Sequence, residues 1–200
     1  MAAIITDIIP SQNFELCLNK IGVVLLEELT NQITLQDLDD ELGVFIARQE
    51  PYSKEEDVMI NITLDNSNYS GKTQLDRQGL TSYNIDVFCG GIESEDQTGS
   101  DNSRIKMLRY AGMIGFILSS TKYKTLGFEN NLIGGTSVDS LQVQNNYGSQ
   151  EASFISFSRI QFSARLQESQ DMWTGIELLD NDTNIKLDLT DKGYQLIFNS

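Results

Sequence analysis

Side chains that could do chemistry are scarce in this 200-residue sequence, because it contains no histidine. Serine–histidine and cysteine–histidine catalysis need that residue, and so do the commonest zinc sites. Ser119 and Ser120 have no histidine to activate them, and Lys122 is not at the helical spacing that serine–lysine catalysis uses. We therefore expect no catalytic residue and no enzyme.

The best candidate for a metal site is a run of oxygen-bearing side chains near the C-terminus. Their spacing approaches positions one, three, five, nine and twelve of a calcium-binding loop. However, Ile185 occupies the position that needs glycine for the sharp turn, and the flanking segments have strand patterns instead of helical ones. We expect a solvated turn, and no metal or other cofactor. The run consists of Asp180, Asp182, Asn184, Asp188 and Asp191.

Two further acidic groups look like solvated connections. The stretch 34–42 fails as a calcium loop, since Gly43 falls one position late and Arg48 replaces the terminal acidic ligand. A second stretch, 90–103, could pair two carboxylates, but glycoside chemistry needs them held rigidly across a cleft, and a loop does that poorly. The acidic residues of this second stretch are Glu93, Glu95 and Asp96.

Neither the glycine pairs nor the two cysteines form a recognisable site. Gly90–Gly91 lacks the lysine of a phosphate-binding loop, and Gly134–Gly135 leads into a strand instead of a helix, so both pairs are predicted to be turns. Cys17 and Cys89 have no short spacing typical of a metal or redox pair, which favours buried free thiols.

The charge of the chain limits its partners. Acidic side chains number 29 and basic ones 14, giving a net charge of -15. Such a surface repels a nucleic-acid backbone or an anionic membrane. Residues 1–10 do not resemble an export signal, and the longest apolar run, 113–118, is far below the ~20 residues of a spanning helix.

Two helices are predicted from residues recurring at helical spacing, at Gln12–Thr30 and about Arg104–Ser120. In the second helix Gly112 and Gly115 each cost ~1 kcal/mol relative to alanine, so we expect a packing benefit that offsets them. Its basic residues, Arg104, Lys106 and Arg109, are expected to pair with acidic loops either of the same chain or of a neighbouring copy. The second helix is expected to face inward with Ile105, Leu108, Ala111, Gly112, Gly115 and Ile117 or Leu118.

The strand patterns predict an α+β fold, a mainly antiparallel sheet packed against two helices. Residues 58–64 and 81–89 alternate between apolar and polar side chains, as paired half-buried strands do. The connection 65–79 is polar and too long for a tight turn, so it should project as a loop or arm. The remaining predicted strands are Val44–Ile46, Ser140–Gln144, Phe154–Leu166 and a small C-terminal β meander of Met172–Leu179, Ile185–Leu189 and Tyr194–Phe198.

This arrangement resembles that of the tail-terminator and head-tail joining proteins of bacteriophages. The resemblance covers residues 10–168, as one domain, and 169–200 would be a C-terminal extension that the simplest members lack. It is a resemblance of pattern, since the family has no invariant motif to compare. It rests on the first helix, the polar arm, and the segments VMINITLD (58–65), TSYNIDVFCGG (81–91), RIKMLRYAGMIGFILSS (104–120) and RIQFSARL (159–166).

The resemblance implies a structural virion subunit in the phage neck or tail, assembled in the host cytoplasm. Copies would form a ring, six being the expected number, that joins the tail tube to the head connector. An acidic lumen would repel the phosphates of DNA and let the DNA pass without binding it tightly. The alternatives are a non-enzymatic binding module, such as an accessory virion or calcium- or receptor-binding protein, and an enzyme. The candidate subunit-interface residues are Tyr69, Lys72, Arg77, Glu93, Glu95, Asp96, Arg104 and Arg109.

Overall fold

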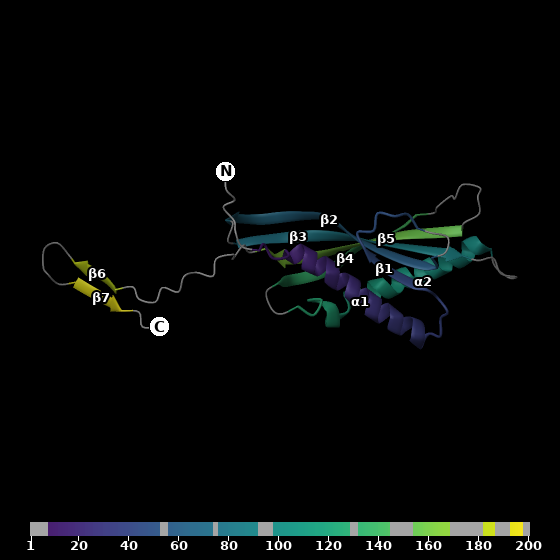
Figure 1. Cartoon of the computed structure of the whole chain (residues 1–200), viewed down its shortest axis with the longest axis horizontal. Helices are drawn as coiled ribbons and strands as arrows, with labels where there is room; N and C mark the ends of the chain where they lie inside the picture. The colour runs from purple at the N-terminus through teal and green to yellow at the C-terminus, as the bar shows by residue number, and fades with distance from the viewer. Residues whose placement is uncertain are drawn as a thin grey trace. The chain divides into compact units, whose positions relative to one another are not determined.

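The computed structural model has a five-stranded sheet with two long helices, in agreement with the predicted α+β class (Figure 1). The chain divides into two units, 1–169 and 170–200. No helix among the described residues is long and apolar enough to cross a membrane. The structure describes residues 8–52, 56–73, 76–91, 98–128, 132–144, 154–168, 182–186 and 193–197.

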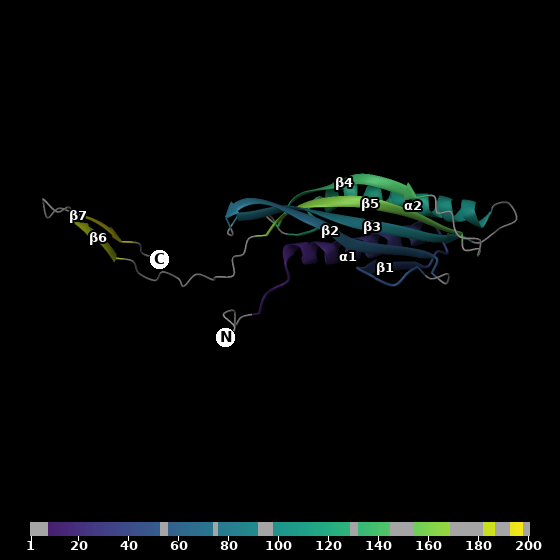
Figure 2. The ribbon, with the colours of Figure 1, turned by 90° about the horizontal axis from the view of Figure 1, so that it is seen from above.

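The sheet of the larger unit has the strand order β1-β2-β3-β5-β4 (Figure 2). β1 runs parallel to β2, and every other neighbouring pair is antiparallel. The alternating pattern of β3 is the clearest: Tyr83, Ile85 and Val87 are fully buried on one face, while Asn84 lies on the other. The strands are β1 (Leu42–Ile46), β2 (Val58–Thr73), β3 (Asp76–Gly91), β4 (Ile133–Gln144) and β5 (Phe154–Gln167).

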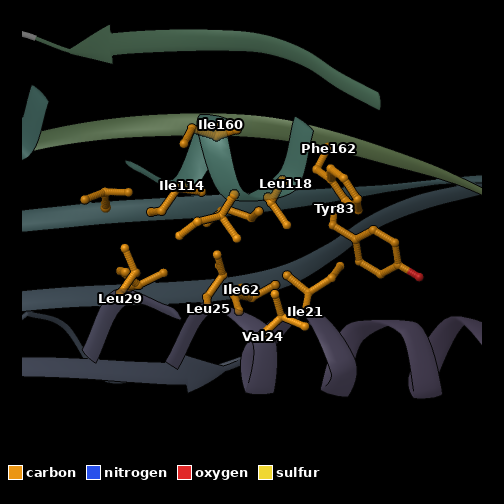
Figure 3. Close-up of a cluster of buried hydrophobic side chains, with 14 of the residues drawn as sticks. Ile21, Val24, Leu25, Leu29, Ile62, Tyr83, Ile114, Leu118, Ile160 and Phe162 are labelled. Atoms are coloured by element: carbon orange, nitrogen blue, oxygen red, sulfur yellow. The ribbon is translucent and has the colours of Figure 1, made fainter. Parts of the chain in front are cut away.

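Both helices, α1 (Asn13–Leu35) and α2 (Gly99–Ser119), cover the same face of the sheet. α1 lies over β1 and β2, whereas α2 lies over β3 and β5 and reaches β4 less. A short 3-10 helix, η1 (Thr121–Tyr123), follows α2. Side chains from the two helices and the inner face of the sheet form a single core, part of which Figure 3 shows.

α1 begins with an unusual cap. Gln12, the residue before the helix, makes no side-chain hydrogen bond to it. Instead the Glu168 carboxylate, from just beyond β5, accepts hydrogen bonds from the backbone N–H groups of Phe14 at 2.9 Å and Asn13 at 3.3 Å. A carboxylate there satisfies free N–H groups and complements the helix dipole. The start of α1 is therefore fixed by the end of the sheet.

The predicted inward face of α2 is wrong in part. Ala111 and Leu118 are buried as expected, but Ile105 is 50% exposed and Leu108 44% exposed. The buried stripe is rotated round the helix and is formed mainly by larger side chains. Because the two glycines were taken as inward-facing, the prediction placed the apolar stripe on the wrong side. The residues that α2 buries are Gly99, Ser103, Met107, Tyr110, Ala111, Ile114, Ile117 and Leu118.

The predicted arm at 65–79 is also different in the structure. β2 and β3 stay paired as far as Thr73 and Asp76, so most of this segment belongs to a long hairpin instead of a loop. β1 pairs with β2 only as far as Ile62. Beyond that residue β2 has no β1 beside it, and its side chains there can be polar. β3 remains paired with β5 from Gln78 onward.

The glycine pairs predicted as turns lie within strands. Gly90 and Gly91 end β3, where a Cβ on Gly91 would meet the Gly99 carbonyl oxygen at 1.9 Å. Gly134 and Gly135 lie in β4, beside an irregularity in its register with β5, and Gly135 has a φ of +144°. Glycine therefore serves close approach at one pair and an irregular backbone at the other.

The smaller unit contains a two-stranded antiparallel sheet, β6 (Asp182–Lys186) with β7 (Gly193–Ile197). β7 lies within one residue of the predicted strand 194–198, and β6 begins three residues earlier than the predicted strand 185–189. The predicted strand 172–179 lies outside the described residues. Two residues of the run that resembles a calcium-binding loop, Asp182 and Asn184, lie in β6.

Candidate functional site

A charged cluster joins α2 to the segment before β1 and to the start of β2. Lys106 Nζ lies 2.8 Å from Asp40 Oδ1 and 2.7 Å from Asp57 Oδ1. The Tyr110 hydroxyl donates to Asp40 Oδ2 at 3.0 Å. For Lys106, pairing within the same chain, one of the two predicted alternatives, is thus confirmed.

The electrostatics of this cluster stabilise its ordinary charge states. Burial alone would raise the pKa of the Asp40 carboxyl, but hydrogen bonds from Lys106 and Tyr110 outweigh burial and hold that pKa below its usual value. Burial would lower the pKa of Lys106, but hydrogen bonds to Asp40 and Asp57 raise it. With these shifts Asp40 and Lys106 both keep their charges near neutral pH, which suits a structural cross-link better than proton transfer.

A cavity of about 450 Å³ adjoins the cluster. Its wall includes Asp40, Asp57 and Lys106, whose charged groups are already paired with one another, and also the exposed side chain of Arg109. The remaining lining is Leu38, Asp39, Gly90, Gly91, Asn102 and Ile105.

The outer face of α2, which points away from the sheet, is both apolar and basic. Phe116 is 82% exposed, and Ile105 and Leu108 are about half exposed on the same side of the helix. Arg104 and Arg109 are exposed beside them, and neither forms an ion pair within the part of the chain that the structure describes. We call Arg104, Ile105, Leu108, Arg109, Gly112 and Phe116 the outer α2 face.

Gly112 and Gly115 of this helix have no packing role among the described residues. A Cβ built on Gly112 or Gly115 would meet no atom within 4 Å. Next to Gly112, a cavity of about 330 Å³ opens between α1 and α2, with Phe116 and Gln32 in its wall. The expected packing benefit of the glycines is therefore not found within the described chain.

The other candidate interface residues are spread along the long hairpin and beyond it. Tyr69 lies on β2 opposite Gly79, whose missing side chain leaves room for the tyrosine ring. Lys72 is on β2 and Arg77 on β3, near the end of the hairpin. The structure does not bring Tyr69 together with the basic residues of α2. Glu93, Glu95 and Asp96 lie outside the described residues.

The carboxylates of Asp40 and Asp57 converge, but both are paired with Lys106. Asp86 is held on the outer sheet face by Arg159, which donates two hydrogen bonds at 2.7 and 2.8 Å. No group of three metal-ligating side chains occurs within the described ranges. Both cysteines are buried, and burial raises the pKa of the Cys17 thiol to about 11.

Sequence reasoning missed several exposed apolar side chains. Phe116 was not assigned a face, and Leu141 and Val143 on β4 are 50% and 38% exposed. A signal for the last two exists in the alternation of 140–144, but alternation alone does not distinguish an edge strand from a central one.

Comparison with known proteins gives no further assignment. No family model matches the sequence, and no curated protein matches it.

Proposed function

We propose that this protein is a structural virion subunit whose copies form a ring in the neck or tail of a bacteriophage, between the tail tube and the head connector. The proposal combines the pattern resemblance with the α+β fold of residues 8–168. A ring subunit needs surfaces for neighbours and needs no catalytic centre. The outer α2 face is the observation that carries this proposal.

Three properties of the outer α2 face favour a partner. Its large apolar side chains are exposed together, which soluble monomers rarely tolerate without a function. Gly112 and Gly115 each lower helix stability by about 1 kcal/mol, and no described neighbour offsets this loss. Arg104 and Arg109, which form no ion pair with any described residue, provide positive charge in a chain of net charge -15, so they suit an acidic neighbour.

The charge of the chain supports the passage of DNA. With 29 acidic and 14 basic side chains, the surface as a whole repels phosphates. A lumen with this charge would bind DNA weakly and allow it to slide.

Native mass spectrometry across a concentration series, with negative-stain imaging of the same sample, tests the proposal. We expect closed rings with a single copy number. A matched pair of variants probes the outer α2 face: Phe116→Ser should weaken association with neighbouring rings or tail components, whereas Ser119→Ala, at the end of the same helix, should not. A chain that stays monomeric at every concentration contradicts the proposed ring.

A further inference from the structure

The two outermost strands of the sheet offer edges for pairing. β1 and β4 each pair with one strand, and within the described residues no other strand covers their outer sides. An open edge carries free backbone N–H and C=O groups, so natural proteins protect it with charges, proline or bulges. An edge without such protection is therefore a candidate for pairing with a strand of another chain.

Both edges contain a five-residue segment without this protection. β1 is LGVFI, with no charge or proline and with an unbroken register against β2. In β4 the irregularities fall between Ile133 and Gly135 and between Val138 and Ser140. From Ser140 to Gln144 the register is regular and the side chains are uncharged.

The exposed apolar side chains of these segments lie on the same face of the sheet. Leu141 pairs in register with the buried Ile160, so it points to the helix-covered face, where it remains 50% exposed. Val143 follows two residues later on that face. On β1, Ile46 pairs with the buried Ile62 and is 40% exposed. Joining the two edges would place these side chains next to one another.

The charges near the two edges are complementary. Exposed carboxylates lie around β1, at Asp39 and Glu41, whereas Glu50 is paired with Arg48. Lys124 lies near β4, because its carbonyl accepts a hydrogen bond from the Thr136 hydroxyl. The side chain of Lys124 is exposed. Arg165, also exposed, pairs in register with Gly135.

β4 also carries one acidic side chain among its described residues. The Asp139 carboxylate accepts hydrogen bonds from the Ser137 and Ser163 hydroxyls, so its charge is already partly satisfied. The positive balance near β4 therefore stands.

We propose that β4 of one copy pairs with β1 of the next copy, so that the sheets of successive subunits form one continuous wall. This inference rests on the proposed ring. The two edges are different surfaces on opposite sides of the sheet, so the contact is head-to-tail, the kind that closes into rings. β4 runs opposite to β1 within one chain, so rotation about an axis along the strands makes the new pair antiparallel.

Thiol cross-linking between the two edges tests this pairing. Cys17 and Cys89 are fully buried, so the natural chain provides a clean background. With a short bis-maleimide, the double variant Ile46→Cys/Leu141→Cys should give a ladder of cross-linked chains ending at the ring copy number. Each single variant should give none, because equivalent edges do not meet. The control pair Val23→Cys/Ser119→Cys, at exposed positions of α1 and α2 outside the outer α2 face, should give no ladder.

The outcomes separate the interface from the ring itself. Rings without a ladder from the edge pair overturn the strand pairing but leave the proposed function intact. Cross-links in a single edge variant, or a ladder only from the helix pair, would show that the copies meet at another interface and would contradict the β4–β1 pairing. Absence of both rings and cross-links contradicts the pairing and the proposed function together.

A pair of lysine substitutions gives an independent measurement. Leu141→Lys places a charge on the β4 edge and should reduce the fraction of chains in rings. Leu80→Lys is the control, since Leu80 is similarly exposed, at 48%, but lies on β3 inside the sheet. Thermal unfolding of both variants checks that they fold. Equal loss of rings in the two variants, or none in either, contradicts the proposed edge.

Discussion

Single residues connect parts of this chain that are far apart in the sequence. Glu168 caps α1, and Arg159 on β5 holds Asp86 on the neighbouring β3. Lys106 joins α2 to Asp40 and Asp57, which precede β1 and β2. Each contact satisfies a charged group that burial would otherwise destabilise. Local sequence patterns could not reveal these partners, because Lys106 and Asp57 are 49 positions apart.

Replacing Lys106 with methionine should lower the free energy of unfolding by about 2 kcal/mol at pH 7, because Asp40 and Asp57 would lose a charged donor. The matched control is Lys124→Met, which removes an exposed lysine that has no ion pair within the described residues. Urea unfolding of both variants measures the difference. Equal effects of the two substitutions would show that the cluster contributes nothing specific.

The loss in free energy of unfolding caused by Lys106→Met should become smaller at acidic pH. In the folded natural chain the pKa of Asp40 lies below the ordinary carboxyl value of 3.8. Its stabilising contribution is therefore full above that value and is lost as the pH falls through the lowered pKa. The difference between the natural chain and the variant should shrink on acidification below about pH 4. A difference that grows in acid would contradict the assigned pairing.

At the scale of elements, alternation and helical spacing predicted most of the fold. The positions of β2, β3, β5 and both helices follow from side-chain periodicity, because burial on one face imposes that periodicity. The parallel pairing of β1 did not follow, since a five-residue apolar strand carries no sign of its direction. The face of α2 was misassigned because glycine fits either a close contact or an uncovered surface.

The uncovered glycines of α2 give the prediction at this scale. Gly112→Ala and Gly115→Ala should each raise the free energy of unfolding by about 1 kcal/mol, because alanine favours the helix and its methyl group meets no atom. Urea unfolding at a concentration where the chain is monomeric measures the gain. Gly91→Ala is the opposite case, since its methyl group would overlap the Gly99 carbonyl. Destabilisation by all three would mean that α2 is covered within the chain.

The candidate interface shows how far sequence reasoning reached. Arg104 and Arg109 were identified from positive charge in an acidic chain, and the structure places both on the surface. Leu141, Val143 and Ile46 were not identified, because their significance comes from lying at sheet edges. Strand order is a property of the whole sheet, and a list of strands does not determine it.

At the scale of the whole molecule, the larger unit contains every element of the main core. The buried cluster runs from Cys17 to Leu166, and Glu168 then closes the start of α1. A domain with its own core can fold without the rest of the chain. The larger unit should therefore fold without residues 170–200, provided that Glu168 is retained.

Truncation after Ser169 should leave the thermal unfolding midpoint close to that of the full chain, measured at equal molar concentration under conditions that keep both monomeric. Truncation after Gln167 removes Glu168, and should lower stability by about 1–2 kcal/mol, because the first N–H groups of α1 lose their cap. Glu168→Gln in the full chain separates the two effects, since it removes the charge but keeps the length. If truncation after Ser169 is as damaging as loss of Glu168, residues 170–200 contribute to the core. If neither change matters, α1 does not depend on this cap.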